Sequence, residues 1–370
     1  MRIAVAGPSH TSTRRLAAAL ARRNHEVLLV TNHPTHTGSS LSRDKQFTEI
    51  FIPYRRFRYC LSDFYRQERR QISQAFKKFQ PDIISSHWCT EFSIAALATD
   101  FPAVVTVRDI PSVVFRYRPS PYVAVRVLMQ HLVLRSARHV TTNSAYTRRH
   151  IYERVRREVQ IVPPIIPSAN REFPDRPSDA DEFLIGTIAS DTAKHKNIFN
   201  LLSAFRLLRN QGLKIRLELV GADFSPDSKF FADCCASDLV QGVSFLGPLS
   251  DGGTIERLRS WGLYVHPSLE ESYGMTVAEA LVNGVPVIGG SDSGAVPELL
   301  GHGRYGLLCN VRSIPSLASA IQSVMLDQDD YSKRARAGGA HLQPRVSPDA
   351  VASTYEELFK SVIAEEALSI

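Results

Sequence analysis

The residues best suited to chemistry lie in a segment that joins an apolar strand to a helix. Glu271 is on the loop after the strand, and Gly274 precedes a helix expected from Thr276 to Asn283, which carries Glu279. Glycine lets the backbone approach a ligand closely, and the free N–H groups of a first helical turn bind anions such as a diphosphate. A helix carboxylate can accept two hydrogen bonds from a ribose diol, and a loop carboxylate can hold the hydroxyls of an attached sugar. The spacing therefore predicts a sugar-nucleotide site.

Around those residues the sequence resembles the glycosyltransferases of family 4, which are retaining enzymes of the GT-B fold. The family motif reads P-S-x-x-E-x-F/Y-G, then E-A, then G-x-P-V-I. The chain matches it at Pro267-Ser268, Glu271, Tyr273-Gly274, Glu279-Ala280 and the run 284–288. A glycine turn and a helix with two solvated glutamates would explain the glutamate spacing, but not the surrounding string.

The resemblance implies a role for each matched residue. Glu279 would bind the nucleotide ribose and Glu271 the donor sugar. The diphosphate would lie on the helix start formed by Gly274, Met275 and Thr276. A second backbone nest is expected at Gly294. No cofactor is implied, because the UDP- or GDP-linked sugar is a substrate.

Two departures from the family pattern direct attention to other residues. The Arg that the family places in a G-R-L turn is missing from residues 186–191, so we expect Lys196 to neutralise the diphosphate; the alternative is a solvated loop lysine. Where family members read T-x-H-D, residues 106–109 read T-V-R-D, which puts Arg108 at the histidine position. Arg108 is expected to serve the leaving diphosphate or the acceptor, or else to form a surface pair with Asp109.

Two histidines follow strands of the first half, and each either contacts substrate or is structural. His87 joins Glu271 and Arg108 as a predicted catalytic residue, and His10 joins the residues that bind the donor. The D-x-D at 327–329 lies between two expected helices and is interpreted as a turn. No metal site is therefore predicted.

Apolar runs alternate with amphipathic stretches along all 370 residues, which is typical of parallel sheets with crossover helices. The predicted fold class is α/β, with two Rossmann-like doubly wound domains of the GT-B fold that face each other across a cleft. We expect an acceptor-side domain at 1–165, a proline-rich linker at 166–180, a sugar-nucleotide domain at 181–345, and a C-terminal helix at 346–370 that is a candidate to cross back to the first domain. Strands are expected near 2–6, 27–31, 82–85, 104–107, 139–142, 183–188, 215–220, 243–245, 263–266, 286–288 and 306–308, and helices near 12–23, 66–79, 121–136 and 144–156.

Charge is divided unevenly along the chain. Residues 1–170 hold 26 Lys and Arg against 11 Asp and Glu, which gives +15, whereas the remainder carries −8. The first half is therefore a candidate to meet an anionic partner, and the arginine-rich segment 54–78, which includes Arg55, is expected to lie on a membrane or to pack as a helix with a basic outer face. No apolar run is long enough for a membrane span or a signal peptide, so we expect a cytoplasmic protein that is a candidate for peripheral binding at the inner membrane face. The five cysteines lack paired spacing and are expected to be reduced.

The sequence as a whole predicts a retaining, metal-independent hexosyltransferase. It would move a sugar from a nucleotide diphosphate to a hydroxyl acceptor, lipid-linked or phosphorylated, in polysaccharide or glycolipid assembly. Two alternatives stay open: a nucleotide-sugar epimerase of the same fold, and a degenerate protein that binds sugar nucleotides without transferring the sugar. No basic cluster carries a nucleic-acid module, so no nucleic-acid partner is predicted.

Overall fold

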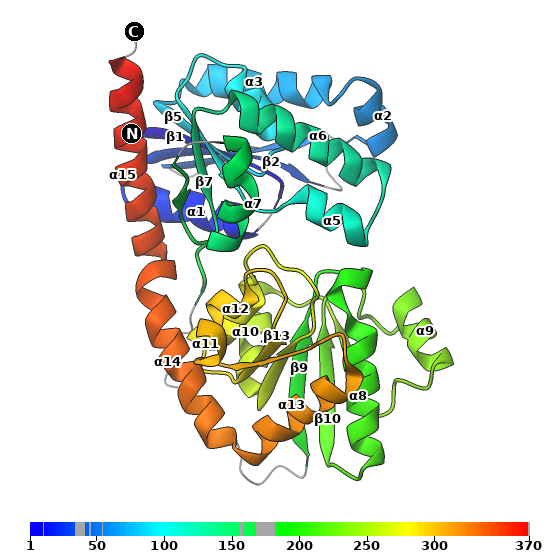
Figure 1. The fold of residues 1–370 in the computed structure, drawn as a ribbon. Coiled ribbons are helices and arrows are strands. Elements are labelled where there is room, and N and C mark those ends of the chain that lie inside the picture. Colours follow the sequence, from blue (N-terminus) through cyan, green and yellow to red (C-terminus); the bar gives the residue numbers. More distant parts are fainter. Residues whose placement is uncertain are drawn as a thin grey trace. The chain divides into compact units, whose positions relative to one another are not determined.

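The computed structural model describes residues 1–9, 11–33, 41–43, 46–53, 55–155, 158–167 and 182–368. The chain divides into two compact units, unit 1 with Met1–Ile165 and Arg345–Ile370, and unit 2 with Ile166–Pro344. Each unit is a largely parallel sheet with helices on its faces (Figure 1). The predicted α/β class is confirmed. His10 and nearly all of the predicted linker lie outside the described residues.

Within its described part, unit 1 has an eight-stranded sheet in the order β3-β4-β2-β1-β5-β6-β7-β8. Its pairings are parallel, except that β3 runs antiparallel to β4. The central strands are continuous apolar or small-residue runs because helices bury them from both sides; every residue of β5 is buried. The strands are β1 (Arg2–Ala6), β2 (Glu26–His33), β3 (Leu41–Arg43), β4 (Phe47–Pro53), β5 (Ile83–His87), β6 (Ala103–Val107), β7 (His139–Thr142) and β8 (Gln160–Ile161).

Helices α1 and α15 cover one face of this sheet, and α3 and α4 cover the other. The C-terminal helix α15 belongs to unit 1 (Figure 1). Its residues Tyr355 and Phe359 enter the same core as Ile3 and Val5. The Tyr355 hydroxyl also lies 3.0 Å from Oγ1 of Thr106 on β6. The helices of unit 1 are α1 (Thr11–Arg22), α2 (Phe57–Ser62), α3 (Arg66–Phe79), α4 (Glu91–Leu97), α5 (Pro111–Tyr117), α6 (Pro121–Ser136), α7 (Ala145–Val155) and α15 (Pro348–Ala367).

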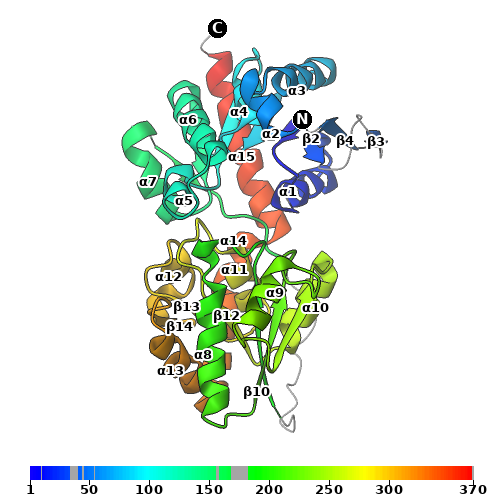
Figure 2. The ribbon, with the colours of Figure 1, turned by 90° about the vertical axis from the view of Figure 1, so that its right-hand side faces the viewer.

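Unit 2 has a parallel six-stranded sheet in the order β11-β10-β9-β12-β13-β14. Helices α8 and α13 lie side by side on one face and share one apolar core with the strands (Figure 2). The strands are β9 (Phe183–Ile188), β10 (Ile215–Val220), β11 (Val243–Gly247), β12 (Leu263–His266), β13 (Val287–Gly290) and β14 (Leu307–Cys309). The helices are η1 (Lys194–Lys196), α8 (Ile198–Asn210), α9 (Lys229–Ala236), α10 (Asp251–Ser260), α11 (Met275–Val282), α12 (Val296–Leu299), η2 (Gly301–Gly303), α13 (Ile314–Leu326) and α14 (Gln328–Val346).

On the opposite face of this sheet, the indole of Trp261 packs against β9. A Cβ added to Gly186 on β9 would lie 1.9 Å from the indole, so only glycine fits there. The indole Nε1 donates to the buried carboxylate of Glu218 at 2.8 Å, and Arg257 of α10 pairs with the same carboxylate. The buried charge is thereby satisfied.

Most of the strongly periodic elements were predicted within two residues of their bounds, and the strands β1, β7, β9, β10 and β12 and the helices α3 and α6 match fully. The elements that were not predicted are the strands β3, β4 and β8 and the short helices α2, α4, α5, α9, α10 and α12. Strand β4 carries Glu49, whose side chain is 3% exposed and pairs with Arg14 of α1 at 2.5 Å. A charge inside a strand interrupts the apolar pattern, and its partner lies on another element.

Each sheet also has a point at which the strand order reverses. The reversal lies between β1 and β5 in unit 1 and between β9 and β12 in unit 2. Loops at the carboxyl ends of two such strands run away from each other, and open α/β sheets bind ligands there. The candidate site residues of both units follow these strands or their neighbours.

Candidate functional site

The site of unit 2 lies at the carboxyl ends of β9 and β12. The chain after β9 leads to η1, which contains Lys196, and the loop after β12 carries Glu271 and leads to α11. Asn197 holds these loops together, because its Nδ2 donates to the carbonyl oxygens of Pro267, at 3.1 Å, and Val311, at 2.8 Å. Lys196 and Glu271, which are 75 positions apart in sequence, thus become neighbours.

Lys196 and Glu271 form a nearly buried ion pair. The ammonium donates to Oε1 at 2.6 Å, and the two side chains are 15% and 17% exposed. Burial by itself would raise the pKa of Glu271, but Lys196 and the nearby His266 hold that pKa below its ordinary value. Burial would likewise lower the pKa of Lys196, and the Glu271 carboxylate raises it above its ordinary value. Both groups are therefore charged at neutral pH.

A chain of polar side chains connects the end of β12 to the first turn of α11. The Tyr264 hydroxyl donates to Oγ1 of Thr276 at 2.6 Å and lies 3.0 Å from Nδ1 of His266. The other ring nitrogen of His266 is 3.4 Å from Oε1 of Glu271, within ion-pair distance but without hydrogen-bond geometry. Tyr264 and His266 are not among the residues predicted from the sequence. Alternate residues of a strand share one face, so these two could have been found as the last inward-facing pair of β12.

The N-terminus of α11 is open to an anion. Gly274 has a φ of 92°, which favours glycine, and as the N-cap residue it offers no side chain to cap the helix. The N–H groups of Met275 and Thr276 therefore lack intrahelical acceptors at the positive end of the helix dipole. Glu279 follows one turn later and is 8% exposed.

The turn around Gly294 supports the Glu271 loop from behind. A Cβ on Gly294 would lie 2.1 Å from the carbonyl oxygen of Glu271, and the next N–H, of Ala295, donates to that oxygen at 2.9 Å. One N–H of the expected nest is thus already used within the protein. In the structure Gly294 shapes the loop that carries Glu271.

In unit 1, His87 and Arg108 meet at the ends of neighbouring strands. The guanidinium Nε of Arg108 donates to Nδ1 of His87 at 3.1 Å. Arg108 is 8% exposed and His87 is fully buried. Burial and the Arg108 charge lower the pKa of His87 well below its ordinary value, so the ring is neutral. Asp109 instead pairs with Arg126 at 2.6 Å. The alternative of a surface pair between Arg108 and Asp109 is therefore wrong.

The predicted site residues thus fall into two groups. Unit 2 brings together the members that would hold the donor, which are Lys196, Glu271, Gly274, Met275, Thr276, Glu279 and Gly294. Unit 1 joins His87 to Arg108. His10 lies outside the described residues. Within the described ranges, no three His, Cys, Asp or Glu side chains are grouped so as to hold a metal ion.

Two family profiles match adjacent parts of this chain. Residues 7–164 match the family described as "Glycosyl transferase 4-like domain", and residues 169–341 match "Glycosyl transferases group 1". The boundary between the matches falls at the boundary between the two units. Together the two profiles account for most of the chain.

Individual relatives agree with these profiles. A phosphatidyl-myo-inositol mannosyltransferase of Mycobacterium leprae is 32% identical over 128 residues, which are 34% of either chain. The chain thus spans about a third of the length of that relative. Among solved structures, sucrose-phosphate synthase from Thermosynechococcus elongatus has a TM-score of 0.82 at 17% identity, covering 99% of this chain and all of that one. An Anabaena protein in complex with UDP and glucose has a TM-score of 0.71 at 18% identity, covering 98% and 100%. The predicted GT-B fold is confirmed by these neighbours.

Proposed function

The chain belongs to the group 1 glycosyltransferases, and from that premise we propose that it transfers a sugar from a nucleotide diphosphate to a hydroxyl acceptor with retention of the anomeric configuration. The bond between the sugar C1 and the diphosphate oxygen breaks, and the diphosphate keeps the electron pair. The acceptor oxygen bonds to C1, and its proton passes to the departing diphosphate oxygen. The acceptor's place in glycan or glycolipid assembly is part of this proposal.

The observation that carries the proposal is the pairing of Lys196 and Glu271 on the loop that leads to the glycine N-cap of α11. A leaving diphosphate gains negative charge, so an ammonium and a set of N–H groups aimed at it stabilise the transition state. Glu271 is kept ionised and so can accept hydrogen bonds from sugar hydroxyls. Glu279 is assigned to the ribose. UDP and glucose in the Anabaena neighbour support a sugar nucleotide as the donor.

We also propose that the reaction needs no metal ion, since Lys196 and the α11 amides supply the positive charge. The test is a transfer assay with UDP- and GDP-sugars, in which the product anomer is read by NMR. Activity is expected to persist in EDTA. Loss of activity in EDTA with recovery on adding manganese would contradict metal independence, and an inverted product would contradict retention.

The two alternatives have their own signatures in the same assay. Isomerisation of the donor sugar without an acceptor would identify an epimerase. Binding of nucleoside diphosphates, seen as a raised melting temperature, without transfer or hydrolysis would identify a degenerate binding protein.

We further propose peripheral binding to anionic membranes through the outer face of α3. A groove of about 580 Å³ between α3 and α4 is lined by four cations and no carboxylate, with Ser73, Gln74, Ile94, Ala95 and Ala98 completing its walls. The cations are Arg66, Arg69, Arg70 and Lys77. No residue in the described part of the chain forms an ion pair with any of these four side chains. Each such cation near an anionic leaflet contributes about 1 kcal/mol.

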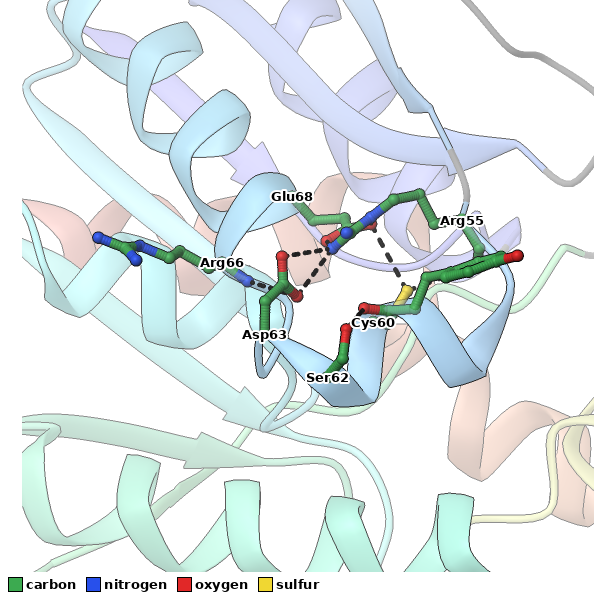
Figure 3. Close-up of polar contacts among 7 residues, drawn as sticks. Arg55, Cys60, Ser62, Asp63, Arg66 and Glu68 are labelled. Carbon is green, nitrogen blue, oxygen red and sulfur yellow. Dashed lines mark hydrogen bonds and ion pairs between the residues drawn. The ribbon is translucent and has the colours of Figure 1, made fainter.

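Arg55, expected to belong to this basic face, lies elsewhere. Its guanidinium donates to Glu68 at 2.5 Å and to Asp63 at 2.9 Å, and Cys60 contacts the same Glu68 carboxylate (Figure 3). The side chain of Arg55 is 24% exposed and its charge is neutralised within unit 1. Removing it would disturb packing as well as charge.

Sedimentation with vesicles tests the membrane proposal. Among the described helices, none is both long and apolar enough to cross a bilayer. We expect binding to vesicles with anionic lipid to exceed binding to neutral vesicles, to fall with salt, and to fall in the triple variant Arg66→Gln, Arg70→Gln, Lys77→Gln. The matched control removes the same charge at three separate exposed sites, with Lys214→Gln, Lys333→Gln and Lys360→Gln. Equal loss in both triple variants would contradict a localised surface.

A further inference from the structure

Arg108 is a buried cation without a counter-ion. The residue is 8% exposed, and no carboxylate of the described residues lies within ion-pair distance. Other shielded arginines of unit 1 are paired: Arg126 with Asp109, and Arg55 with Glu68 and Asp63. Burying an unpaired charge opposes folding, so a retained unpaired guanidinium indicates an anion that arrives from outside the chain.

The immediate neighbours of Arg108 do not neutralise it. His87 is neutral and accepts from the Nε of Arg108 through Nδ1, which leaves its other nitrogen to donate to Oγ of Ser85 at 3.3 Å. The Trp88 ring, 5.6 Å from the guanidinium carbon, offers a cation–π contact. These contacts use Nε and the flat face, and among the described residues none accepts from Nη1 or Nη2. That pair of nitrogens is the fork that grips a carboxylate or phosphate with two parallel hydrogen bonds.

The surroundings suit a ligand. Arg108 follows β6 and His87 is the last residue of β5, beside the reversal of strand order between β1 and β5. Asn143, 5% exposed, donates through Nδ2 to the carbonyl oxygen of Arg108 at 3.0 Å, while its Oδ1 is buried without a partner. Trp88 has a φ of 62°, a conformation that is rare for aromatic residues and that concentrates at ligand-binding positions. An unused acceptor, an unused guanidinium fork and a strained backbone therefore lie together.

We propose that Arg108 is a specificity residue that binds an anionic group, a carboxylate or phosphate, carried by one of the two sugar substrates. The inference rests on the proposed glycosyl transfer and narrows its substrate class to an anionic sugar. The charged group could belong to the donor sugar or to the acceptor, and the guanidinium fork recognises both in the same way.

Thermal-shift titrations separate these sources. The donor pair is UDP-glucuronate against UDP-glucose, and the acceptor pair is glucose 6-phosphate against glucose, measured with UDP present. We expect one pair to favour its anionic member in the wild type, and Arg108→Gln to bind that member about 10- to 100-fold more weakly while binding the neutral member and UDP unchanged. Arg108→Lys keeps the charge without the fork, so its affinity for the anionic member is expected to lie between those of the wild type and Arg108→Gln. Arg148→Gln, at an exposed position of α7, is the matched control and should retain the preference.

The stability of the unliganded protein separates a ligand role from a structural one. Because an uncompensated buried charge opposes folding, Arg108→Met is expected to melt at or above the wild-type temperature. The inference is overturned if Arg108→Met melts well below the wild type, or if neither anionic probe is preferred while UDP still raises the melting temperature. If UDP itself causes no shift, the proposed donor site of unit 2 fails instead.

Discussion

Replacing Lys196 with methionine removes the cation that neutralises Glu271. With 2.6 Å between Nζ and Oε1 and an effective dielectric constant of about 20, the attraction is about 6 kcal/mol. The variant also avoids the cost of burying an ammonium, so we expect a net loss of about 3 kcal/mol in the free energy of unfolding at pH 7. The remaining penalty comes from the Glu271 carboxylate, left 17% exposed without its main partner.

The loss of stability caused by Lys196→Met depends on pH. In the wild type the folded pKa of Glu271 lies below the unfolded value of about 4.5, so its contribution is present above that pH and is lost as the pH falls through the folded pKa. Without Lys196, burial dominates and raises the folded pKa. Protonation of the variant then begins at a higher pH in the folded state, so the penalty shrinks between pH 7 and pH 5.

A double-mutant cycle with urea unfolding at both pH values measures the effect. Adding Glu271→Gln to Lys196→Met is expected to recover about 2 kcal/mol at pH 7. The control is Lys229→Met, which breaks an ion pair of 3.0 Å with Asp233 between side chains 88% and 49% exposed and should cost less than about 0.5 kcal/mol. The reasoning is refuted if Lys196→Met lowers the free energy of unfolding no more than Lys229→Met does, or lowers it equally at both pH values. The ion pair would then not be shielded from solvent as the structure shows.

Three further predictions concern ligand binding and packing. Glu279→Ala should weaken nucleotide binding about 10- to 100-fold by calorimetry, while Glu271→Ala should mainly lower kcat in the transfer assay; equal and negligible effects would refute the assignment. Gly186→Ala should destabilise by at least about 2 kcal/mol because its methyl group would enter an indole ring, whereas Gly252→Ala, with no atom within 4 Å of its added Cβ, should be neutral or stabilising in thermal unfolding. The pKa of Glu356 on α15 is lowered to about 2 by the hydrogen-bonded guanidinium of Arg23. The difference in the free energy of unfolding between the wild type and Glu356→Gln should therefore narrow as the pH falls from 5 towards 2. A constant difference would contradict that pairing.

The amino-acid sequence by itself determined most of the strongly periodic elements and the donor motif. Apolar runs with a period of two or 3.6 residues fix which face each segment must bury, and this holds whatever the segment packs against. The loop–glycine–helix unit around Glu271, Gly274 and Glu279 could be read in the same way. Its residues are close in sequence, and their geometry follows from a strand that ends where a helix begins.

Tertiary structure decided which side chains meet across the sheets. The pairing of Lys196 with Glu271 depends on β9 and β12 becoming neighbours, and no local pattern gives that strand order. Likewise, Arg108 followed by Asp109 has the spacing of a surface ion pair. Only the packing of β5 beside β6 turns the guanidinium inward to His87 and gives Asp109 to Arg126. Charge pairing is decided by distances between elements, and the one-dimensional pattern of a chain does not contain those distances.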